Sequence, residues 1–428
     1  MKRNPKPLTA LAVGLALSVT ALGGTTALAQ DEQELTFSLW AYEGDIAAAY
    51  DEFIAAFEEQ HPGVTITVEA QPFAQYHDTI NVKLAGGDPP DIAWIAYNLA
   101  PTYIDAGALL DLRPVLESLE GYEFDDLRPS SLEPWSVGDA IYGIPFTNST
   151  NVMYYNKDIF EAAGLPDPDE MVANGEWTWE NVREVARQIV DSGAARYGYV
   201  FGNNIYNNGW RILEDIWAPY GAGPWSADGT ECRFDDTETV EATQLVWDMV
   251  FTDGSHPEPG VDANFFASDV GMGLYRPSQA SLLPDVDFEW GIAPQPSGPL
   301  GYVPSAATNG ITVFAGGDDP ELAAQFLALT TNPEGARRNS QSFPSARASM
   351  QTMDVLGPAN PILSEEDIET TVLAAIAHPD ASWGYNHTNW GPLFTDAQRI
   401  FDGDIWRPDA DVAAALAQVC AEIEPLLG

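Results

Sequence analysis

Apolar and polar positions alternate in a regular way at the start of the chain, and their spacing changes between a strand period and a helix period. The helical spacing is interrupted at His61-Pro62-Gly63 and again at Gly86-Gly87, which are stop signals. Three strands therefore alternate with two helices: we expect strands at 35–39, 64–68 and 92–97, and helices at 46–57 and 76–84. This order predicts an α/β fold with a mainly parallel sheet and helices on both of its faces.

Residues 138–179 contain a second ordered run of elements. A short apolar segment around Pro145 predicts a strand, but proline lacks a backbone donor, so a buried central strand should not run through it. Residues 152–155 begin a new apolar run, and Asn156 is placed to cap a helix that Gly164 ends. We therefore expect the chain to change from one folding unit to another near Pro145.

The length of 428 residues and a hydrophobic content of 45% provide material for two packed cores. Residues 1–29 combine a basic head, an apolar run at 8–22 and the small-x-small sequence Ala27-Leu28-Ala29, which is typical of a cleaved export signal. That apolar run is shorter than the roughly 20 residues that span a bilayer, and a membrane anchor is the alternative interpretation.

Acidic residues dominate the charge. The formal net charge is −46, and removal of Lys2, Arg3 and Lys6 with the export signal makes it −49. Nucleic acids and anionic lipids are poor partners for such a surface. The simplest interpretation is an acidic coat that keeps an exported protein soluble, including at high salt.

Cys232 and Cys420 are the only cysteines. In an oxidising compartment a disulfide between them is the default expectation, and two buried free thiols are the alternative. The five histidines are scattered, and none pairs with another histidine or a cysteine at zinc-ligand spacing. We therefore expect no metal and no cofactor.

Aromatic and amide side chains follow two of the predicted strands. Trp40 and Tyr42 come after the first strand, and Tyr97 and Asn98 lie at the end of the third. Ligands of open α/β sheets bind at the carboxyl ends of the strands. These positions are therefore candidates for a ligand site, and core packing is the competing interpretation of each aromatic residue.

Four stretches of the sequence, taken in order, resemble the extracellular solute-binding proteins of carbohydrate ABC importers, the family 1 type that includes maltose-binding protein. They are EFIAAFEEQHPGVTI, KLAGGDPPDI, IYGIP followed by MYYNKDIFEAAGLP and WTWENV, and the long segment that begins DPELAAQFLALTTNPEGARR. The resemblance covers nearly the whole mature chain.

This resemblance implies a two-lobed periplasmic-binding-protein fold, each lobe a mainly parallel sheet flanked by helices, with three crossings between the lobes at about 145–150, 305–311 and 343–348. Both cysteines then fall in the same lobe. The implied division is a signal peptide at 1–29, an N-terminal lobe at 30–147 plus 309–344, and a C-terminal lobe at 148–308 plus 345–428.

Candidate ligand contacts follow from strand ends, from composition and from the resemblance. The candidate aromatic walls are Trp40, Tyr42, Trp210, Tyr275, Trp383 and Trp390. The candidate polar and backbone contacts are Glu43, Asp45, Gln75, Tyr76, Asp91, Asn98, Thr147, Asn148, Arg276, Gly310 and Arg347. Tyr275 and Arg347 are chosen because matching residues of similar proteins face the ligand, whereas Asp45 and Asp91 have capping as an equally good interpretation.

The function implied is capture of a neutral di- or oligosaccharide and its delivery to a two-subunit permease with a cytoplasmic ATPase. An anionic solute, a glycerophosphodiester or uronate held by Arg276 or Arg347, is the first alternative. A secreted glycoside hydrolase is the second, because 64 acidic residues cannot exclude a catalytic pair. Many relatives have a lipid-bearing cysteine just after the signal core, where this chain has Thr25 after Gly24. We therefore expect a protein that is free in the periplasm. We also expect it to be a monomer.

Overall fold

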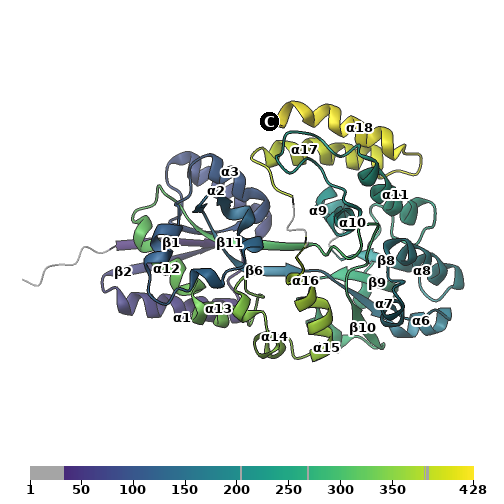
Figure 1. Ribbon diagram of the computed structural model, residues 1–428, viewed down its shortest axis with the longest axis horizontal. Coiled ribbons are helices and arrows are strands. Elements are labelled where there is room, and N and C mark those ends of the chain that lie inside the picture. Colours follow the sequence, from purple (N-terminus) through teal and green to yellow (C-terminus); the bar gives the residue numbers. More distant parts are fainter. Residues whose placement is uncertain (1–32, 203–204, 268, 380, 382–384) are drawn as a thin grey trace, which may run out of the picture.

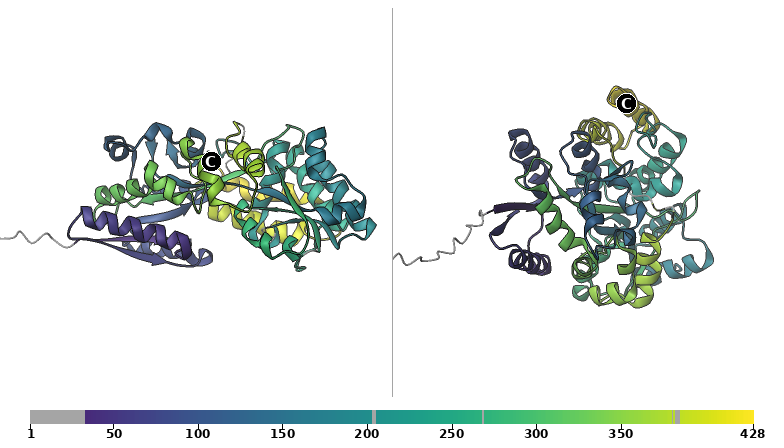
Figure 2. Two further views of the ribbon diagram at one scale, coloured as in Figure 1. Left: turned by 90° about the horizontal axis from the view of Figure 1, so that it is seen from below. Right: turned by 60° about the vertical axis from the view of Figure 1, so that its left-hand side comes forward.

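The computed structural model describes residues 33–202, 205–267, 269–379, 381 and 385–428. The predicted export signal therefore lies outside the described residues. Two lobes, each built on its own sheet, lie side by side and are joined near the middle of the molecule (Figure 1). Figure 2 shows the same division from two further directions. The two-lobed α/β architecture expected from the sequence is confirmed.

The N-terminal lobe contains a five-stranded sheet in the order β2-β1-β3-β11-β6. The β-α-β-α-β succession predicted for its first part is present. Its strands are β1 (Gln33–Leu39), β2 (Val64–Ala70), β3 (Ile92–Ala96), β6 (Ile144–Thr150) and β11 (Ala306–Val313), and β4 (Ser136–Val137) pairs separately with β5 (Ala140–Ile141). Its helices are α1 (Gly44–Gln60), α2 (Phe73–Gly86), α3 (Ala100–Asp105), α4 (Arg113–Ser118), α5 (Pro129–Leu132), α12 (Pro320–Thr331) and α13 (Pro333–Asn339).

The C-terminal lobe contains a four-stranded sheet in the order β10-β7-β9-β8. Its strands are β7 (Val152–Asn156), β8 (Tyr197–Phe201), β9 (Val270–Tyr275) and β10 (Trp290–Ala293). Its helices are α6 (Lys157–Ala163), α7 (Pro168–Asn174), α8 (Trp179–Ser192), α9 (Ile205–Asn208), α10 (Glu214–Tyr220), α11 (Thr237–Phe251), α14 (Met353–Ala359), α15 (Glu365–Asp367), α16 (Ala374–Ile376), α17 (Trp390–Ile400) and α18 (Val412–Ile423).

Strand pairing in both sheets is mixed, which corrects the expectation of mainly parallel sheets. In the N-terminal lobe β1 pairs with β2 and β3 in parallel, but β11 runs antiparallel to both β3 and β6. In the C-terminal lobe β8 and β9 are parallel, whereas β7 runs antiparallel to both β9 and β10. The physical reason is the connectivity: β11 brings the chain back from the other lobe, so it enters the sheet in the opposite direction to the local β-α-β strands.

The helix predicted after residue 156 forms as the capping residues indicate. The side chain of Asn156 accepts a hydrogen bond from the backbone nitrogen of Ile159 at 3.1 Å, and Gly164 ends α6 in a left-handed conformation with φ of 71°. Pro145, by contrast, does not interrupt its strand. It lies within β6, which tolerates proline because β6 is an edge strand of the five-stranded sheet.

A two-stranded ribbon leads from one lobe to the other. β6 and β11 are paired as far as Thr150 and Ala306, beyond the last pairing of β11 with β3 at Asn309 and Ala96. After Asn151 the chain enters β7 of the other sheet. The predicted lobe borders at 147/148 and 308/309 cut through this ribbon, because the residues on both sides of them are paired in one sheet.

The predicted disulfide between Cys232 and Cys420 is present, with 5.5 Å between the two Cα atoms. It ties the segment before α11 to α18, and both cysteines pack in the large hydrophobic core of the C-terminal lobe. The bond therefore closes a long loop within one lobe and leaves the junction between the lobes unconstrained.

Candidate functional site

The edge of the N-terminal sheet that faces the other lobe carries three aromatic side chains. Trp40 follows β1, Phe73 begins α2 after β2, and Tyr97 follows β3. These three strands run in parallel register, so their carboxyl ends lie at one edge, the edge from which the β6–β11 ribbon leads to the C-terminal lobe. The structure thus places Trp40 and the end of β3 where strand order predicted a ligand.

Trp40 is half-buried in a group of rings from four elements. Its ring centroid lies 5.1 Å from that of Trp94, 5.4 Å from Phe73 and 5.3 Å from Tyr76. All three contacts are edge-to-face, an arrangement that aromatic pairs favour. The indole is therefore held in one orientation by its neighbours while part of its surface stays open.

Phe73 was missed by the sequence interpretation, which chose Gln75 and Tyr76 instead. The Phe73 side chain is 51% exposed, whereas Tyr76 is 1% exposed and donates a hydrogen bond to the backbone oxygen of Ser38 at 2.8 Å. The helical period alone does not indicate this exposure, because Phe73 lies three residues before Tyr76 and shares its face of α2. Phe73 is exposed because it is the first residue of the helix and lies at its end. An exposed phenylalanine beside Trp40 is the more open of the two aromatic surfaces.

Charged residues of the C-terminal lobe lie near Tyr97. We call the group of Tyr97, Arg211, Glu214, Asp215 and Arg276 the interlobe cluster. Arg211 precedes α10, the two acidic residues begin α10, and Arg276 follows β9. Glu214 and Asp215 are 8% and 5% exposed, whereas Arg211 and Arg276 are half-buried, so the two carboxylates have little access to water and the two arginines keep some.

The electrostatics of the interlobe cluster are balanced between the two signs of charge. Burial raises the pKa of Tyr97 to about 12, with Glu214 raising it and Arg211 and Arg276 lowering it. Burial lowers the pKa of Arg276, and the nearby carboxylate of Asp215 opposes this. The guanidinium of Arg276 also donates to the backbone oxygen of Ser149 at 2.9 Å. The cluster can therefore offer planar donors and acceptors without a strong net charge.

Asp215 connects two of the three segments that cross between the lobes. Its carboxylate accepts hydrogen bonds from the Asn151 amide at 3.1 and 2.9 Å, and another from the Ser305 hydroxyl. Asn151 lies between β6 and β7, and Ser305 immediately precedes β11. Burial raises the pKa of Asp215, and the hydrogen bonds from Ser305 and Asn151 oppose this shift.

Gln295 strengthens the same junction. Its side-chain amide donates to Thr150 Oγ1 at 2.9 Å and to the Ser305 backbone oxygen at 3.1 Å, and its Oε1 accepts from the Ser305 backbone nitrogen at 2.9 Å. Neither Asp215 nor Gln295 was a candidate from the sequence, because each is defined by partners far away along the chain. Together they fix the C-terminal end of β6 and the N-terminal end of β11 to the C-terminal lobe.

Several predicted residues lie at or near the faces between the lobes, on the same edge as Trp40 or in the interlobe cluster. Tyr42 is half-buried and donates a hydrogen bond to Asp51, and Asn98 is half-buried after β3. Three further predicted residues of this edge are exposed: Glu43, Asp45 and Gln75. Arg276 is the predicted residue that the C-terminal lobe contributes. We keep this group as the candidate site.

Trp210 and Trp390, predicted as sugar walls, are core residues. They are 0% and 5% exposed and belong to the main cluster of the C-terminal lobe, where Trp210 stacks on Trp217 with centroids 5.9 Å apart. The prediction rested on local sequence context, whereas the burial comes from packing between α10, α17 and the segment around Trp225. Trp383 lies outside the described residues.

Arg347, predicted to face the ligand, is a structural residue of the N-terminal lobe. It is 0% exposed, and its guanidinium donates to the backbone oxygens of Thr331, Glu123 and Tyr122 at 2.7, 2.8 and 2.6 Å. Its charge also lies 4.9 Å from the centre of the Tyr122 ring. These contacts place Arg347 in the N-terminal lobe, although the predicted division gave residues from 345 onward to the other lobe.

Asp91 and Gly310 also have structural roles. Asp91 precedes β3 at the end away from the ribbon, and its carboxylate accepts from the backbone nitrogens of Thr36 at 2.7 Å and Asp318 at 2.8 Å. At Gly310 a Cβ atom would lie 2.7 Å from the Trp135 ring, so this position is needed for packing and not for approach of a ligand.

Thr147 and Asn148 are buried inside the ribbon at 4% and 0% exposure. Thr147 Oγ1 accepts from the backbone nitrogen of Asn309 at 3.1 Å, and the Asn148 amide donates to Ser131 at 3.3 Å. Their burial corrects the prediction that they are ligand contacts. They belong instead to the connection on which any relative movement of the lobes depends.

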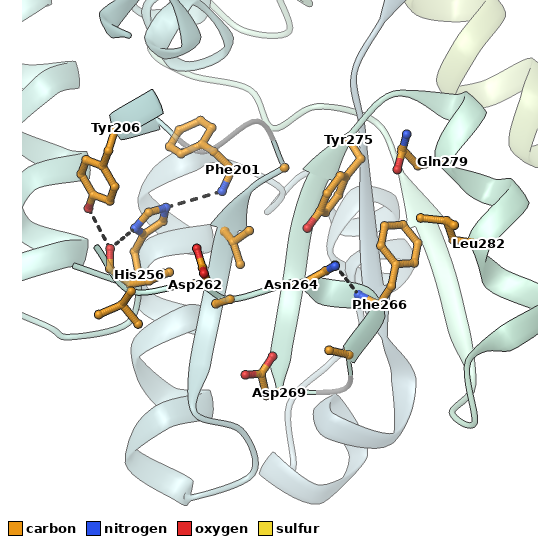
Figure 3. A pocket seen from close by; sticks show the side chains of 16 residues that line it. Phe201, Tyr206, His256, Asp262, Asn264, Phe266, Asp269, Tyr275, Gln279 and Leu282 are labelled. Atoms are coloured by element: carbon orange, nitrogen blue, oxygen red, sulfur yellow. Dashed lines mark hydrogen bonds between the residues drawn. The ribbon is translucent and has the colours of Figure 1, made fainter. Parts of the chain in front are cut away.

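Tyr275 turns away from the interlobe cluster. Its ring covers Gly202 and Gly273, where a Cβ atom would lie 2.2 and 2.3 Å from ring atoms, and its hydroxyl accepts from the backbone nitrogen of Phe265 at 3.3 Å. The ring faces a separate cavity within the C-terminal lobe (Figure 3). Its predicted role as a wall of the interlobe site therefore does not fit its position.

Within the described ranges, no helix has the length and apolar character needed to cross a membrane. The same residues contain no group of three or more His, Cys, Asp or Glu side chains arranged to hold a metal ion.

Comparison with known proteins identifies relatives across most of the chain. A family profile described as bacterial extracellular solute-binding protein matches residues 40–337. A putative binding protein of Brucella abortus (strain 2308) is 26% identical over 326 residues, covering 73% of this chain and 74% of the relative. An arabinooligosaccharide-binding protein of Bacillus subtilis (strain 168) is 24% identical over 321 residues, covering 71% and 70%.

A solved structure has the same architecture. An ABC substrate-binding protein of Listeria monocytogenes in complex with cycloalternan superposes with a TM-score of 0.76, covering 92% of this chain and 99% of that protein at 21% identity. At this level of identity the similarity establishes the fold.

Proposed function

Because the chain belongs to the bacterial extracellular solute-binding proteins, we propose that it is the exported binding component of an ABC importer that captures a neutral di- or oligosaccharide between its lobes. It delivers this sugar to a two-subunit permease with a cytoplasmic ATPase. It works as a monomer, free in the periplasm, and performs no chemistry on the ligand.

The observation that carries this proposal is the pairing of two different surfaces across the junction. The N-terminal lobe contributes the open faces of Trp40 and Phe73, and the C-terminal lobe contributes the planar polar groups of the interlobe cluster. Apolar rings suit the C–H faces of pyranoses, and carboxylate and guanidinium groups each take two hydroxyls. The relatives named for arabinooligosaccharides and cycloalternan support the same ligand class.

A neutral ligand is favoured over an anion by the surroundings of Arg276. Its guanidinium is engaged by the Ser149 carbonyl and lies near the carboxylate of Asp215, so its charge is compensated before a ligand arrives. A uronate or a glycerophosphodiester would need an arginine with an uncompensated charge, in a chain with a formal charge of −46.

Tryptophan fluorescence titrated with a sugar panel tests the proposal, because closure of the lobes changes the surroundings of Trp40. We expect saturable binding of at least one neutral oligosaccharide and no response to uronates. A response to anions alone would contradict the ligand class, and release of product from chromogenic glycosides would contradict a purely binding role. Small-angle scattering with and without the sugar measures the closure itself.

A further inference from the structure

The cavity that Tyr275 faces has a volume of about 590 Å³, within the range of small-molecule sites. Its sixteen lining residues all come from the C-terminal lobe, between Val200 and Leu282. None of them belongs to the interlobe cluster. The cavity is therefore separate from the candidate sugar site, and the inference drawn from it does not depend on the proposed function.

Aromatic side chains form two opposite walls of this cavity. Figure 3 shows Tyr206 and Phe201 on one side and Tyr275 and Phe266 on the other. The rings of Phe266 and Tyr275 lie 5.1 Å apart at an interplanar angle of 63°, so they hold each other in place. The Tyr206 hydroxyl is fixed by donation to the Pro257 backbone oxygen at 2.7 Å. Aromatic faces carry negative electrostatic potential, which attracts cations.

Carboxylates lie between and below these walls. Asp262 and Asp269 both line the cavity (Figure 3). Asp269 is half-buried; its Oδ1 is shielded from solvent and has no hydrogen-bond partner among the described residues, so the other carboxylate oxygen is the one that can face the cavity. The Asp269 charge acts on the Tyr275 hydroxyl, because it raises the pKa of Tyr275, although burial is the larger cause.

The described lining of this cavity carries no positive charge at neutral pH. Of the sixteen described residues that line the cavity, none is lysine or arginine. The one histidine, His256, has its Nδ1 2.8 Å from the Pro257 backbone oxygen, and its Nε2 lies 3.5 Å from the backbone nitrogen of Phe201. These partners suit a neutral ring that donates from Nδ1, and burial lowers the pKa of His256 to about 4. The imidazole is therefore uncharged at neutral pH.

We propose that this cavity is a second ligand site, which binds a small organic cation with a protonated or quaternary amine between Asp269 and the rings of Tyr275 and Phe266. The cationic group supplies the charge that the cavity lacks, and the aromatic faces contribute cation–π attraction. The amides of Asn264 and Gln279 are available at the mouth for polar groups on the rest of the solute. Anions are excluded by the two carboxylates.

The test uses two molecules of nearly the same shape. Choline carries a quaternary nitrogen, and 3,3-dimethylbutan-1-ol replaces it with carbon. Calorimetry in about 1 M NaCl, where the screening length is about 3 Å, suppresses general accumulation of cations on the acidic surface. We expect choline to bind with a stoichiometry of one and its neutral analogue to bind at least tenfold more weakly.

Two variants and a control connect this binding to the cavity. Asp269→Asn keeps the shape and removes the charge, and Phe266→Leu removes one aromatic face; each should weaken choline binding at least fivefold. Asp285→Asn removes an exposed carboxylate of the same lobe that does not line the cavity and should change nothing. A neutral sugar that binds between the lobes should not compete with choline.

The proposal is wrong if choline does not bind saturably or if the neutral analogue binds equally well. Equal losses in Asp269→Asn and Asp285→Asn would also overturn it, since they would indicate a surface effect. If Asp269→Asn does not fold, the choline affinity of Phe266→Leu tests the proposal: an unchanged affinity would overturn it. Competition by the sugar would place choline in the interlobe site and would also overturn it.

Discussion

Asn151 directs its side-chain amide at both carboxylate oxygens of Asp215, with nitrogen–oxygen distances of 3.1 and 2.9 Å. This contact joins the first crossing between the lobes to the start of α10. Ser305, at the second crossing, donates to the same carboxylate. The C-terminal end of β6 and the N-terminal end of β11 are thus fixed to the C-terminal lobe, so bending between the lobes is expected in the ribbon around Asn148 and Thr308.

Replacement of Asp215 by Asn should change how stability depends on pH. Burial holds the pKa of Asp215 above its unfolded value, so between those two values the folded state retains a proton that the unfolded state has lost. The stability that the Asp215 carboxyl group contributes is therefore fully present below its unfolded pKa and is lost as the pH rises through its folded pKa. This loss is at most about 1.4 kcal/mol per pH unit.

Urea denaturation of the wild type and of Asp215→Asn between pH 3 and 8 measures this difference. The stability of the wild type relative to the variant should fall as the pH rises. A constant difference across the range would show that Asp215 does not titrate with folding. Scattering profiles of the variant without ligand report whether the junction has also loosened.

Phe73→Ala should weaken sugar binding about tenfold, equivalent to about 1.4 kcal/mol, because it removes an exposed ring beside Trp40. The melting temperature should change little, since Phe73 is half-exposed. Val82→Ala is the matched control: Val82 is on the same helix, is 73% exposed and lies away from the Trp40 ring group. Equal affinities of the two variants would remove Phe73 from the site.

Arg347→Gln should destabilise the protein by about 3 kcal/mol or more, because it leaves three backbone carbonyls without a charged donor in a buried position. Arg399, whose side chain is 57% exposed, provides the control, and Arg399→Gln should cost less than about 1 kcal/mol. Calorimetric melting compares the two. A variant that keeps its stability but loses sugar affinity would restore Arg347 as a ligand contact.

Removal of the Cys232–Cys420 bond should lower stability by about 5 kcal/mol in the chain-entropy view, since the bond spans 188 positions of the chain. The double variant Cys232→Ala/Cys420→Ala should therefore unfold at lower urea concentration than the oxidised wild type. Sugar affinity at low temperature should be unchanged, because the bond lies within one lobe. If a thiol reagent reacted with wild-type protein that had been denatured without a reductant, the bond would be absent.

Local chemistry in the sequence predicted local structure well. Asn156 and Gly164 set the ends of α6 because a cap depends on residues three or four positions apart. The period of apolar residues predicted the first three strands and two helices, because that period also depends on residues that are close together in the chain. Pro145 misled the interpretation, because its effect depends on whether the strand is central or at an edge, and only the pairing with β11 decides that.

The candidate site was harder to predict, because the exposure of a side chain is decided by distant parts of the chain. Trp210 and Phe73 are both aromatic residues near element ends, yet Trp217, Trp225 and Trp390 bury the first and nothing covers half of the second. Asp215 became recognisable as a junction residue only when Asn151 and Ser305 were seen beside it.

Composition and neighbours along the chain were enough to predict the family resemblance, the order of the elements, the candidate disulfide and the aromatic character of the strand ends. The tertiary structure decided which of those aromatic residues remain open and that Arg347 holds backbone carbonyls. It also decided that Tyr275 faces a cavity of its own. The physical reason is that burial and hydrogen-bond satisfaction arise where segments far apart in sequence pack together.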